Sequence, residues 1–319
     1  MADAPTPYVR PKDIDNRSTF WQRMQWRAEA VAWDVVYWWP MKMLGPDRAS
    51  NFCGWLVKKI GPRMSQHKTV RRNLKLAFPD WTDEQINATA LESWECVGRV
   101  AGELPHLGKL DPASGDRIEI IGSEHYTAIQ DSEKGGVMIS GHFANWEVMC
   151  AVITYFMPDI VITYRALNNP YIDRRIANAR MTYGMAASAA KGIGTREMMR
   201  ALSSGRAIGI MNDQKFNEGI PVKFFGHDAM TAPGPTRLAI RYDVPIVLTY
   251  TVRTGPARFR VTIYPPIQPH NTGDQQADIR ATVEEITAFI EARVRENPGQ
   301  WFWQHRRWPK SAWKDAGIT

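Results

Sequence analysis

Short apolar runs alternate with helical segments from about Arg117 onward, and this alternation constrains the fold more than any other feature of the chain. Runs such as "GVMIS" are typical of strands buried on both faces. Strands that alternate with helices predict an α/β fold, a largely parallel central sheet flanked by helices. The predicted strands are 117–121, 136–140, 159–164, 207–212, 221–225, 245–250 and 258–264, and the predicted helices are 144–156, 169–184, 195–204, 233–242 and 274–297.

Residues 20–108 have a different texture and read as mostly helical. The helix from Asp83 is well marked, with Thr82 as its expected N-cap and two acids in its first turn. The chain therefore divides into an N-terminal tail and helical region, 1–112, and an α/β core, 113–319, which form either two parts or one continuous domain.

Tryptophan is concentrated near the two ends of the chain: six of the 13 lie between Trp21 and Trp55, and four more between Trp301 and Trp313. The first group belongs to a helix that can face an ordinary protein core. No run of about 18 apolar residues occurs there, so it does not read as a membrane span. Tryptophan favours the lipid headgroup level, so both groups favour a membrane surface. Beside the first group, the stretch 58–75 has seven Lys or Arg and no acid. We therefore expect an N-terminal region that associates with an anionic membrane surface, with a solvated basic helix or an RNA-binding strip as alternatives.

The charge balance also favours anionic partners. The chain has 40 Lys and Arg against 33 Asp and Glu, a formal charge of +7. It shows no nucleic-acid-binding motif, so we expect no nucleic-acid partner. Its three cysteines, Cys53, Cys96 and Cys150, have no paired spacing, which indicates a reducing compartment and neither disulfides nor a cysteine-based metal site.

The segment "GGVMISGHFANWEVMCAV" (135–152) places His142 after a buried strand and Glu147 five residues later, inside a helix. Such a pair arises by chance about once in this composition, and His106 with Asp111 is a second instance in a loop-like stretch. Residues five apart on one helix point about 140° away from each other, so the pair can meet only if His142 lies in the turn that Gly141 permits. A strand–turn–helix gives that geometry at the carboxyl end of a strand, where α/β sheets bind ligands. A capping or solvent-facing histidine is the alternative.

Further candidate residues follow other predicted strands. An arginine at a strand end can bind phosphate or an oxyanion, or can simply face solvent in a loop. Polar residues after a strand suit a binding site or a simple turn equally well. The binding candidates are Asn145, Tyr164, Asn168, Asp213, Gln214, Lys215 and Arg237, and the arginine is Arg165.

Nucleophilic catalysis has little support in the sequence. No G-x-S-x-G elbow occurs, and Cys150 reads as a buried core cysteine rather than an acyl-accepting thiol.

Several segments in order resemble the late acyltransferases of lipid A biosynthesis, the lauroyl/myristoyl transferase group of the lysophospholipid-acyltransferase-like superfamily. They are "RRNLKLAFPDWTDEQ", "SGHFANWE", "TYRALNNPYID", "NDQKF…VKFFG…TAPGPTRLA" and "NPGQWFWQHRRWP", between about Val70 and Trp308. The resemblance places His142 and Glu147 on the family's histidine–carboxylate motif, Arg165 on its active-site arginine, and Asp213 and Gln214 on its Asp-Gln element. The N-terminal apolar segment is less hydrophobic than the family's usual membrane anchor, which favours surface attachment.

The resemblance implies an acyl carrier protein thioester as donor, with coenzyme A as the alternative, and a hydroxyl of a phosphorylated glucosamine-disaccharide lipid as acceptor. It implies no cofactor and a location at the cytoplasmic face of the bacterial inner membrane. In this hypothesis His142 removes the hydroxyl proton and Glu147 holds the imidazole. Lys215 and Arg237 hold phosphates of the acceptor, and the positive surface receives the carrier protein. Two alternatives remain: an acyltransferase with another glycolipid or lysophospholipid acceptor, and a non-enzymatic protein that binds membranes or nucleic acid.

Overall fold

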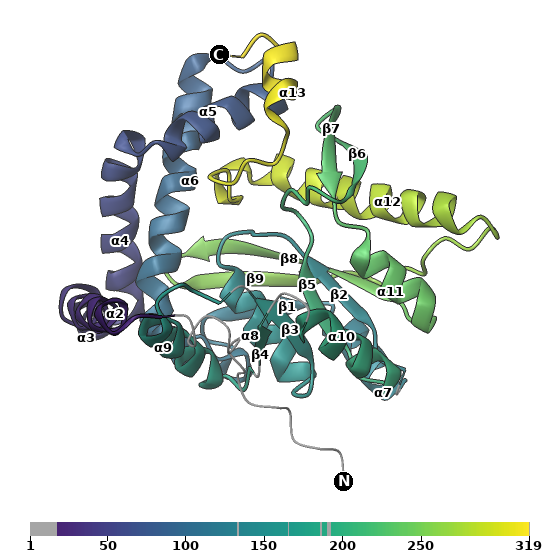
Figure 1. The fold of residues 1–319 in the computed structure, drawn as a ribbon, viewed down its shortest axis with the longest axis horizontal. Coiled ribbons are helices and arrows are strands. Elements are labelled where there is room, and N and C mark those ends of the chain that lie inside the picture. The colour runs from purple at the N-terminus through teal and green to yellow at the C-terminus, as the bar shows by residue number, and fades with distance from the viewer. Residues whose placement is uncertain (1–17, 133, 165, 186, 190–192, 319) are drawn as a thin grey trace.

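The computed structural model describes residues 18–132, 134–164, 166–185, 187–189 and 193–318. A twisted sheet lies at the centre with helices on both faces, and the N-terminal helices stand along one side of it (Figure 1). The predicted α/β class is confirmed.

Seven strands form the central sheet in the order β1-β9-β8-β2-β5-β3-β4, and every neighbouring pair is parallel except β8 and β9. Their buried apolar side chains explain why the runs in the sequence are nearly continuous rather than alternating. The strands are β1 (Ile118–Ile121), β2 (Val137–Ser140), β3 (Val161–Tyr164), β4 (Ala187–Ala189), β5 (Ile208–Met211), β8 (Ile246–Gly255) and β9 (Arg258–Ile263).

One predicted strand lies outside this sheet. The run 221–225 forms β6 (Ile220–Phe224), which pairs antiparallel with β7 (His227–Thr231) in a separate hairpin. Phe225 and Gly226 both have positive φ, 52° and 77°, the backbone that a tight hairpin turn requires. Strands β4 and β7 were not predicted, because neither has an apolar run long enough to stand out.

Two hydrophobic cores fill the two faces of the sheet. One face is covered by α7 and α8 with strand residues such as Met138 and Ile162, and the other by α10, α11, α12 and the N-terminal α5 and α6. These helices are α5 (Gln66–Ala77), α6 (Asp83–Glu103), α7 (Ser123–Asp131), α8 (Trp146–Phe156), α9 (Pro170–Met181), α10 (Ile193–Ser203), α11 (Gly234–Tyr242), α12 (Gln275–Glu296) and the C-terminal α13 (Lys310–Asp315).

The N-terminal region is a helical layer that begins with an almost continuous rod. The rod comprises α2 (Phe20–Trp33), the π-helix η1 (Asp34–Trp38) and α3 (Trp39–Leu44). It ends at Gly45, which has a φ of 75°, and α4 (Pro46–Ile60) then runs in a different direction (Figure 1). Trp26 and Ala30, four residues apart, are buried on the inner face of α2. Helix α4 packs closely on α6, because Gly98 and Gly102 lack the Cβ atoms that would collide with the backbone of α4.

Two further expectations from the sequence, one about a helix cap and one about the tryptophans, have different outcomes. Thr82 caps α6, and its hydroxyl and the Gln85 side chain form a reciprocal capping box. The C-terminal tryptophans do not face a membrane: Trp301, Trp303, Trp308 and Trp313 are all buried in the core. Among the described helices, none is both long and apolar enough to cross a bilayer. The boundary at residue 112 stays a prediction.

Candidate active site

Strand register brings His142 and Asp213 together. In the parallel pair β2–β5, the last residues Ser140 and Met211 lie opposite each other, and His142 and Asp213 each come two positions later. The His142 Nδ1 atom lies 2.7 Å from Asp213 Oδ1, and the His142 backbone N–H donates to Asp213 Oδ2 at 2.7 Å. Neighbouring parallel strands therefore end in a histidine–carboxylate pair at the carboxyl edge of the sheet.

Asp213 is only 2% exposed and is held by three donors. The Trp301 indole N–H donates to Oδ2 at 2.8 Å, beside the two contacts from His142. Burial alone would raise the pKa of Asp213, but attraction to His142 and these hydrogen bonds outweigh it and lower the pKa. Gly141 makes this approach possible, because a Cβ there would lie 3.1 Å from Asp213 Oδ2.

The imidazole of His142 is oriented for proton transfer. When Nδ1–H donates to the Asp213 carboxylate, Nε2 carries the lone pair, and the Gln214 amide nitrogen lies 3.2 Å from Nε2. The ring packs at 5.3 Å from the Trp146 ring and at 6.0 Å from the Phe302 ring. This arrangement has the parts of a general base: a fixed tautomer, a buried carboxylate behind it and a polar side that a hydroxyl can approach.

The expected contact between His142 and Glu147 is wrong. Glu147, 3% exposed, pairs instead with Arg180, whose Nε and Nη2 lie 2.9 Å and 2.5 Å from its two oxygens. The Tyr183 hydroxyl also donates to Glu147 at 3.2 Å. Glu147 lies in the first turn of α8 and pairs with Arg180 of α9, whereas the imidazole of His142 faces Asp213 after β5. The catalytic importance of Glu147 stays a prediction, but its carboxylate does not hold the imidazole.

A cavity of about 330 Å³ opens beside His142, between α8 and strands β3 and β5. Its lining combines the polar groups near His142 with apolar side chains farther in. They are His142, Trp146, Glu147, Met149, Cys150, Ile153, Ile162, Thr163, Tyr164, Arg180, Met185, Gly209, Ile210, Met211 and Gln214. The Arg180 guanidinium lies 5.0 Å from the centroid of the Tyr164 ring, which covers the charged pair.

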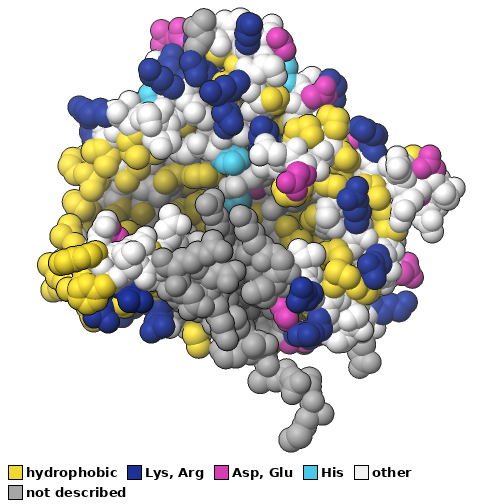
Figure 2. All heavy atoms as spheres, in the orientation of Figure 1, with side chains coloured by type: hydrophobic (Ala, Val, Ile, Leu, Met, Phe, Trp, Pro, Cys, Tyr) yellow, Lys and Arg dark blue, Asp and Glu magenta, His cyan; other side chains and the backbone are white. Residues whose placement is uncertain are grey.

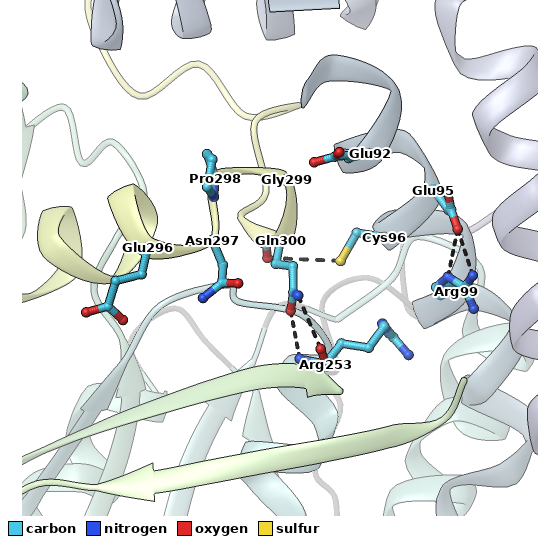
Figure 3. Close-up of a pocket in the computed structure, with 10 residues that line it drawn as sticks. All are labelled: Glu92, Glu95, Cys96, Arg99, Arg253, Glu296, Asn297, Pro298, Gly299 and Gln300. Carbon is cyan, nitrogen blue, oxygen red and sulfur yellow. Dashed lines mark hydrogen bonds and ion pairs between the residues drawn. The ribbon is translucent and has the colours of Figure 1, made fainter. Parts of the chain in front are cut away.

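The loop that carries His142 is clamped from behind by residues 297–303. The Ala144 N–H donates to Gln300 O at 2.7 Å, and the Phe302 N–H donates to His142 O at 3.2 Å. Ala144 has a φ of 45°, unusual for a residue with a Cβ, and these bonds hold it there. Figure 3 shows Gln300 in turn bonded to the backbone of Arg253, beside a second cavity of about 300 Å³ that contains none of the predicted site residues.

The remaining predicted residues are distributed unevenly. Asn145 is fully buried; its carbonyl caps α8 and its amide donates to Glu103 at 2.8 Å, so both ends are occupied within the protein. Tyr164 and Gln214 line the cavity. Lys215 directly follows Gln214, and its backbone N–H donates to His305 Nε2.

Two of the predicted residues lie on the protein surface, away from the cavity, and a third is not among the described residues. Asn168 is exposed in the segment that leads into α9, and Arg237 is exposed on α11. Neither lines the described cavity beside His142. Arg165 falls outside the described residues, so its predicted catalytic role stays a prediction.

Sequence reasoning missed Arg180, Tyr183 and Trp301. Arg180 lies in a helix, where one more arginine carries no local signal. Trp301 was assigned to a membrane-facing group by composition, although its indole N–H donates to the Asp213 carboxylate. His305, a partly buried histidine that accepts from the Lys215 backbone N–H, was also unassigned.

Two other candidates have structural roles. His106 of the second His-x4-acid pattern is buried, with Nε2 2.9 Å from Met41 O, and burial lowers its pKa. Cys150 is buried in the cavity wall, where desolvation and the nearby Glu147 raise its pKa to about 12. A thiol in that state is not a nucleophile near neutral pH.

A family model for "Bacterial lipid A biosynthesis acyltransferase" matches residues 19–310. The chain belongs to this family. The lipid A biosynthesis lauroyltransferase of Escherichia coli (strain K12) is 22% identical over 253 residues, 75% of this chain and 78% of the relative. The lipid A biosynthesis acyltransferase of Haemophilus influenzae is 24% identical over 262 residues, 80% of this chain and 81% of the relative. The phosphatidylinositol mannoside acyltransferase of Mycolicibacterium smegmatis is 22% identical over 250 residues, 75% and 78%.

Family membership replaces the non-enzymatic interpretation. The protein is an O-acyltransferase that transfers an acyl group to a lipid, and lipid A biosynthesis is the process its family serves. The His142–Asp213 pair beside an apolar cavity is the place in the described structure where that chemistry fits.

Proposed function

We propose that the protein transfers a fatty acyl chain from an acyl carrier protein thioester to a hydroxyl of a phosphorylated glucosamine-disaccharide lipid A precursor. The observation that carries the proposal is the His142–Asp213 pair at the edge of an apolar cavity. A general base and a hydrocarbon-sized cavity side by side suit a reaction between a hydroxyl and a fatty thioester.

The proposed mechanism is direct transfer between two bound substrates. His142 Nε2 takes the proton of the acceptor hydroxyl as its oxygen bonds to the thioester carbon. Asp213 stabilises the resulting imidazolium through Nδ1. The tetrahedral intermediate then breaks its C–S bond, and the leaving thiolate takes the proton back from Nε2. An ester and a free thiol result, and no side chain is acylated.

Arg180 is the described cation best placed to act on this intermediate. Its Nε and Nη2 are occupied by Glu147, and among the contacts of the described residues Nη1 makes no hydrogen bond. A preorganised guanidinium suits a developing oxyanion or a substrate phosphate. In this proposal Glu147 fixes the orientation of Arg180, Arg165 is a second cation, and Lys215 and Arg237 hold acceptor phosphates.

The N-terminal helices supply the surface that we propose lies on an anionic membrane, at the cytoplasmic face of the bacterial inner membrane. Figure 2 shows apolar side chains gathered over α2 to α4, beside a hollow with apolar walls. Trp21 and Met43 are 79% and 86% exposed. The other exposed large apolar residues between positions 20 and 64 are Phe20, Met24, Val31, Val35, Val36, Trp39, Leu44, Phe52, Trp55, Leu56, Ile60 and Met64. Such a surface costs free energy in water and gains it at a lipid interface.

Helix α5 supplies a basic surface suited to an acidic carrier protein. Lys68, Arg71, Arg72 and Lys75 line a recess of about 410 Å³. The helix also borders the site, because the Asn73 amide donates to the carbonyls of Trp303 and His305. Complementary charge at this position would guide the carrier toward His142.

The decisive experiment is an acyl-transfer assay with purified protein, an acyl carrier protein thioester and a tetraacylated lipid A precursor. Wild type should transfer the acyl group and His142→Ala should not. Equal transfer by both would reject His142 as the base. No transfer to this acceptor, with transfer to other lipids, would retain the acyltransferase and reject the lipid A assignment.

A second acceptor class has a specific observation in its favour, since the mannoside acyltransferase relative is as similar as the lauroyltransferase. The assay therefore includes a phosphatidylinositol mannoside and a lysophospholipid. The same assay with coenzyme A thioesters identifies the donor.

A further inference from the structure

We propose that Arg307 is a positioning residue for acyl transfer: its buried guanidinium holds the loop that carries Asp213 and supplies the positive charge that balances the Asp213 carboxylate. This inference rests on the part of the proposed function that makes His142 and Asp213 the base pair. It adds a residue that lies outside the lining of the cavity, and it predicts a pH dependence that a merely structural arginine would not produce.

Arg307 is one of the largest fully buried side chains of the protein, only 1% exposed. In the part of the chain that the structure describes, no carboxylate forms an ion pair with it, whereas Arg180 and Arg253 each pair with a glutamate. A buried charge costs free energy unless other groups compensate it. A guanidinium buried without a paired carboxylate therefore indicates compensation by hydrogen bonds and by a more distant anion.

The hydrogen bonds of Arg307 attach it to the end of β7. Nη1 donates to Met230 O at 3.0 Å, and Nη2 donates to Thr231 Oγ1 at 2.6 Å. The loop after β5 is attached to the same strand end, because the Phe216 N–H also donates to Met230 O at 3.0 Å. Phe216 comes three residues after Asp213, so one carbonyl connects the guanidinium to the loop that carries the carboxylate.

A series of aromatic contacts makes a second connection between Arg307 and Asp213. The guanidinium lies 5.1 Å from the centroid of the Phe224 ring, and that ring lies 5.7 Å from the Trp301 ring. The Trp301 indole N–H in turn donates to Asp213 Oδ2. Both ends of this series are buried, so water screens the attraction between the two charges little.

Asp213 is the anion that acts on Arg307. Burial lowers the pKa of Arg307 to about 10, and the attraction of Asp213 opposes that effect. Among the described residues, no other charged group acts on this guanidinium in the same way. The resting pair of Asp213 and Arg307 is therefore neutral as a unit, with the imidazole of His142 beside it.

Other titratable or charged groups lie on the elements around the base pair. They are Lys215 on the same loop, His305 and Arg306 on the C-terminal segment, and Glu147, Cys150, Tyr164 and Arg180 around the cavity. Glu147 and Arg180 compensate each other, Arg306 is exposed, and burial lowers the pKa of His305, which leaves its ring neutral. Arg307 is thus the cation of this region that is both buried and without a paired carboxylate.

The charge of Arg307 makes the base pair harder to protonate. A nearby positive charge disfavours a proton on Asp213 and equally disfavours the imidazolium of His142. Without that charge, the pair as a whole takes up a proton at higher pH, whichever atom holds it. The acid limb of kcat/KM, which reports the base of the free enzyme, should therefore move to higher pH when Arg307 is neutralised.

The first test measures kcat/KM against pH for wild type and Arg307→Met, which keeps much of the bulk and removes the charge. The acid limb should move upward by about half a pH unit or more, a modest effect for one buried charge. At neutral pH the rate should fall about tenfold or more, because the loop of Asp213 also loses its attachment to the guanidinium.

The Arg307→Met variant has a physical reason to fold. Met230 O keeps the hydrogen bond from the Phe216 N–H, and the Thr231 hydroxyl keeps its bond to Ala229 O. Circular dichroism and Tm confirm the fold.

Two control variants separate charge from hydrogen bonding and from general loss of an arginine. Thr231→Val removes one of the two hydrogen bonds but leaves the guanidinium charge, so its acid limb should stay at the wild-type pH. Arg293→Met removes an arginine of α12 whose ion-pair partner, Glu296, lies on the same helix, and it should also leave the limb in place. A folded Arg307→Met whose acid limb matches wild type would overturn the proposal, and so would an equal shift in Thr231→Val or Arg293→Met.

A second measurement does not depend on transfer: the free energy of unfolding in denaturant at about pH 7 and at about pH 3. The pKa of Asp213 is lowered in the folded protein, so its charged form adds stability that is lost as the pH falls through the folded pKa. Part of that stability requires Arg307. The loss between the two pH values should therefore be smaller in Arg307→Met than in wild type, whereas Thr231→Val should lose as much as wild type does.

The two measurements distinguish this inference from the proposed function. If wild type transfers no acyl group but the loss of stability depends on Arg307 in this way, the coupling to Asp213 stands and the proposed function fails. If wild type transfers acyl groups and Arg307→Met changes neither the acid limb nor the pH dependence of stability, this inference fails and the proposed function stands.

Discussion

The loop after β5 and the first turn of α8 each place a buried carboxylate beside the same cavity, but the two carboxylates have different partners. Asp213 accepts from the imidazole of His142 and from the Trp301 indole, whereas Glu147 pairs with the guanidinium of Arg180. One carboxylate supports a group that gains and loses a proton, and the other supports a permanent cation. The carboxylate nearer to His142 in sequence is thus not the one that contacts its imidazole.

The largest expected effect tests the Asp213 side. Asp213→Asn keeps the shape of the side chain but removes the charge that stabilises the imidazolium and selects its tautomer. By analogy with the carboxylate of a catalytic triad, we expect kcat to fall about 10³- to 10⁴-fold. Transfer rates of the purified variant measure this, and circular dichroism confirms that it is folded. Retention of more than a tenth of wild-type activity would show that Asp213 does not assist His142.

The Glu147 side should respond mainly in stability. Glu147→Gln leaves Arg180, whose side chain is 15% exposed, without its counter-charge, and breaking a buried pair costs at most about 3–5 kcal/mol of the free energy of unfolding. We expect a lower Tm in Glu147→Gln and a smaller loss of kcat than in Asp213→Asn.

The matched control for this comparison is the double variant Glu147→Gln with Arg180→Gln, which removes both charges. Its free energy of unfolding should recover part of the loss, as a double-mutant cycle would show. A loss of kcat as large as that of Asp213→Asn, at unchanged Tm, would instead return Glu147 to the role of partner of the base.

A smaller effect, on the pH of acid unfolding, is expected from removing the Trp301 indole N–H that donates to Asp213. The pKa of Asp213 is lower in the folded protein than the value of about 3.9 in an unfolded chain, so its charged form adds stability above that pH, and this stability is lost as the pH falls through the folded pKa. Trp301→Phe removes one hydrogen bond to the carboxylate and should raise the folded pKa of Asp213. Acid unfolding, followed by tryptophan fluorescence, should therefore begin at a higher pH than in wild type.

Trp303→Phe is the control for this experiment, because the Trp303 indole donates to a neutral carbonyl, that of Pro298. It should lower stability at all pH values without moving the acid transition in the same way. Equal shifts in both variants would mean that lost packing, rather than the carboxylate, explains the result.

The sequence predicted the elements that carry the site better than the contacts within it. The runs before His142 and Asp213 were recognised as strands, and both residues were placed at strand ends. Their contact depends on β2 and β5 being neighbours in register, although 71 positions separate the two residues. No local pattern contains that information. The His-x4-acid spacing could propose only a partner close in sequence, and it proposed Glu147.

The tryptophans show the same limit from another direction. The sequence analysis assigned the N-terminal and the C-terminal tryptophans alike to a membrane surface. Trp21 is indeed exposed on α2, but Trp301 is buried against Asp213. Both are apolar rings with one N–H, and only tertiary contacts decide whether that N–H meets a headgroup or a carboxylate.

The smallest expected effect concerns Cys150, which lines the cavity beside His142 and follows Glu147 by three positions on α8. Its pKa of about 12 leaves almost no thiolate at neutral pH, and direct transfer requires none. Cys150→Ala removes one heavy atom from an apolar wall, so the rate should change by no more than about fourfold, the equivalent of about 0.8 kcal/mol for a group of methylene size. Intact-mass measurement of wild type incubated with the donor alone should show no added acyl chain. An acylated protein whose adduct disappears in Cys150→Ala, together with a loss of transfer, would replace direct attack with a two-step route and would leave His142 and Asp213 to activate a thiol instead of a lipid hydroxyl.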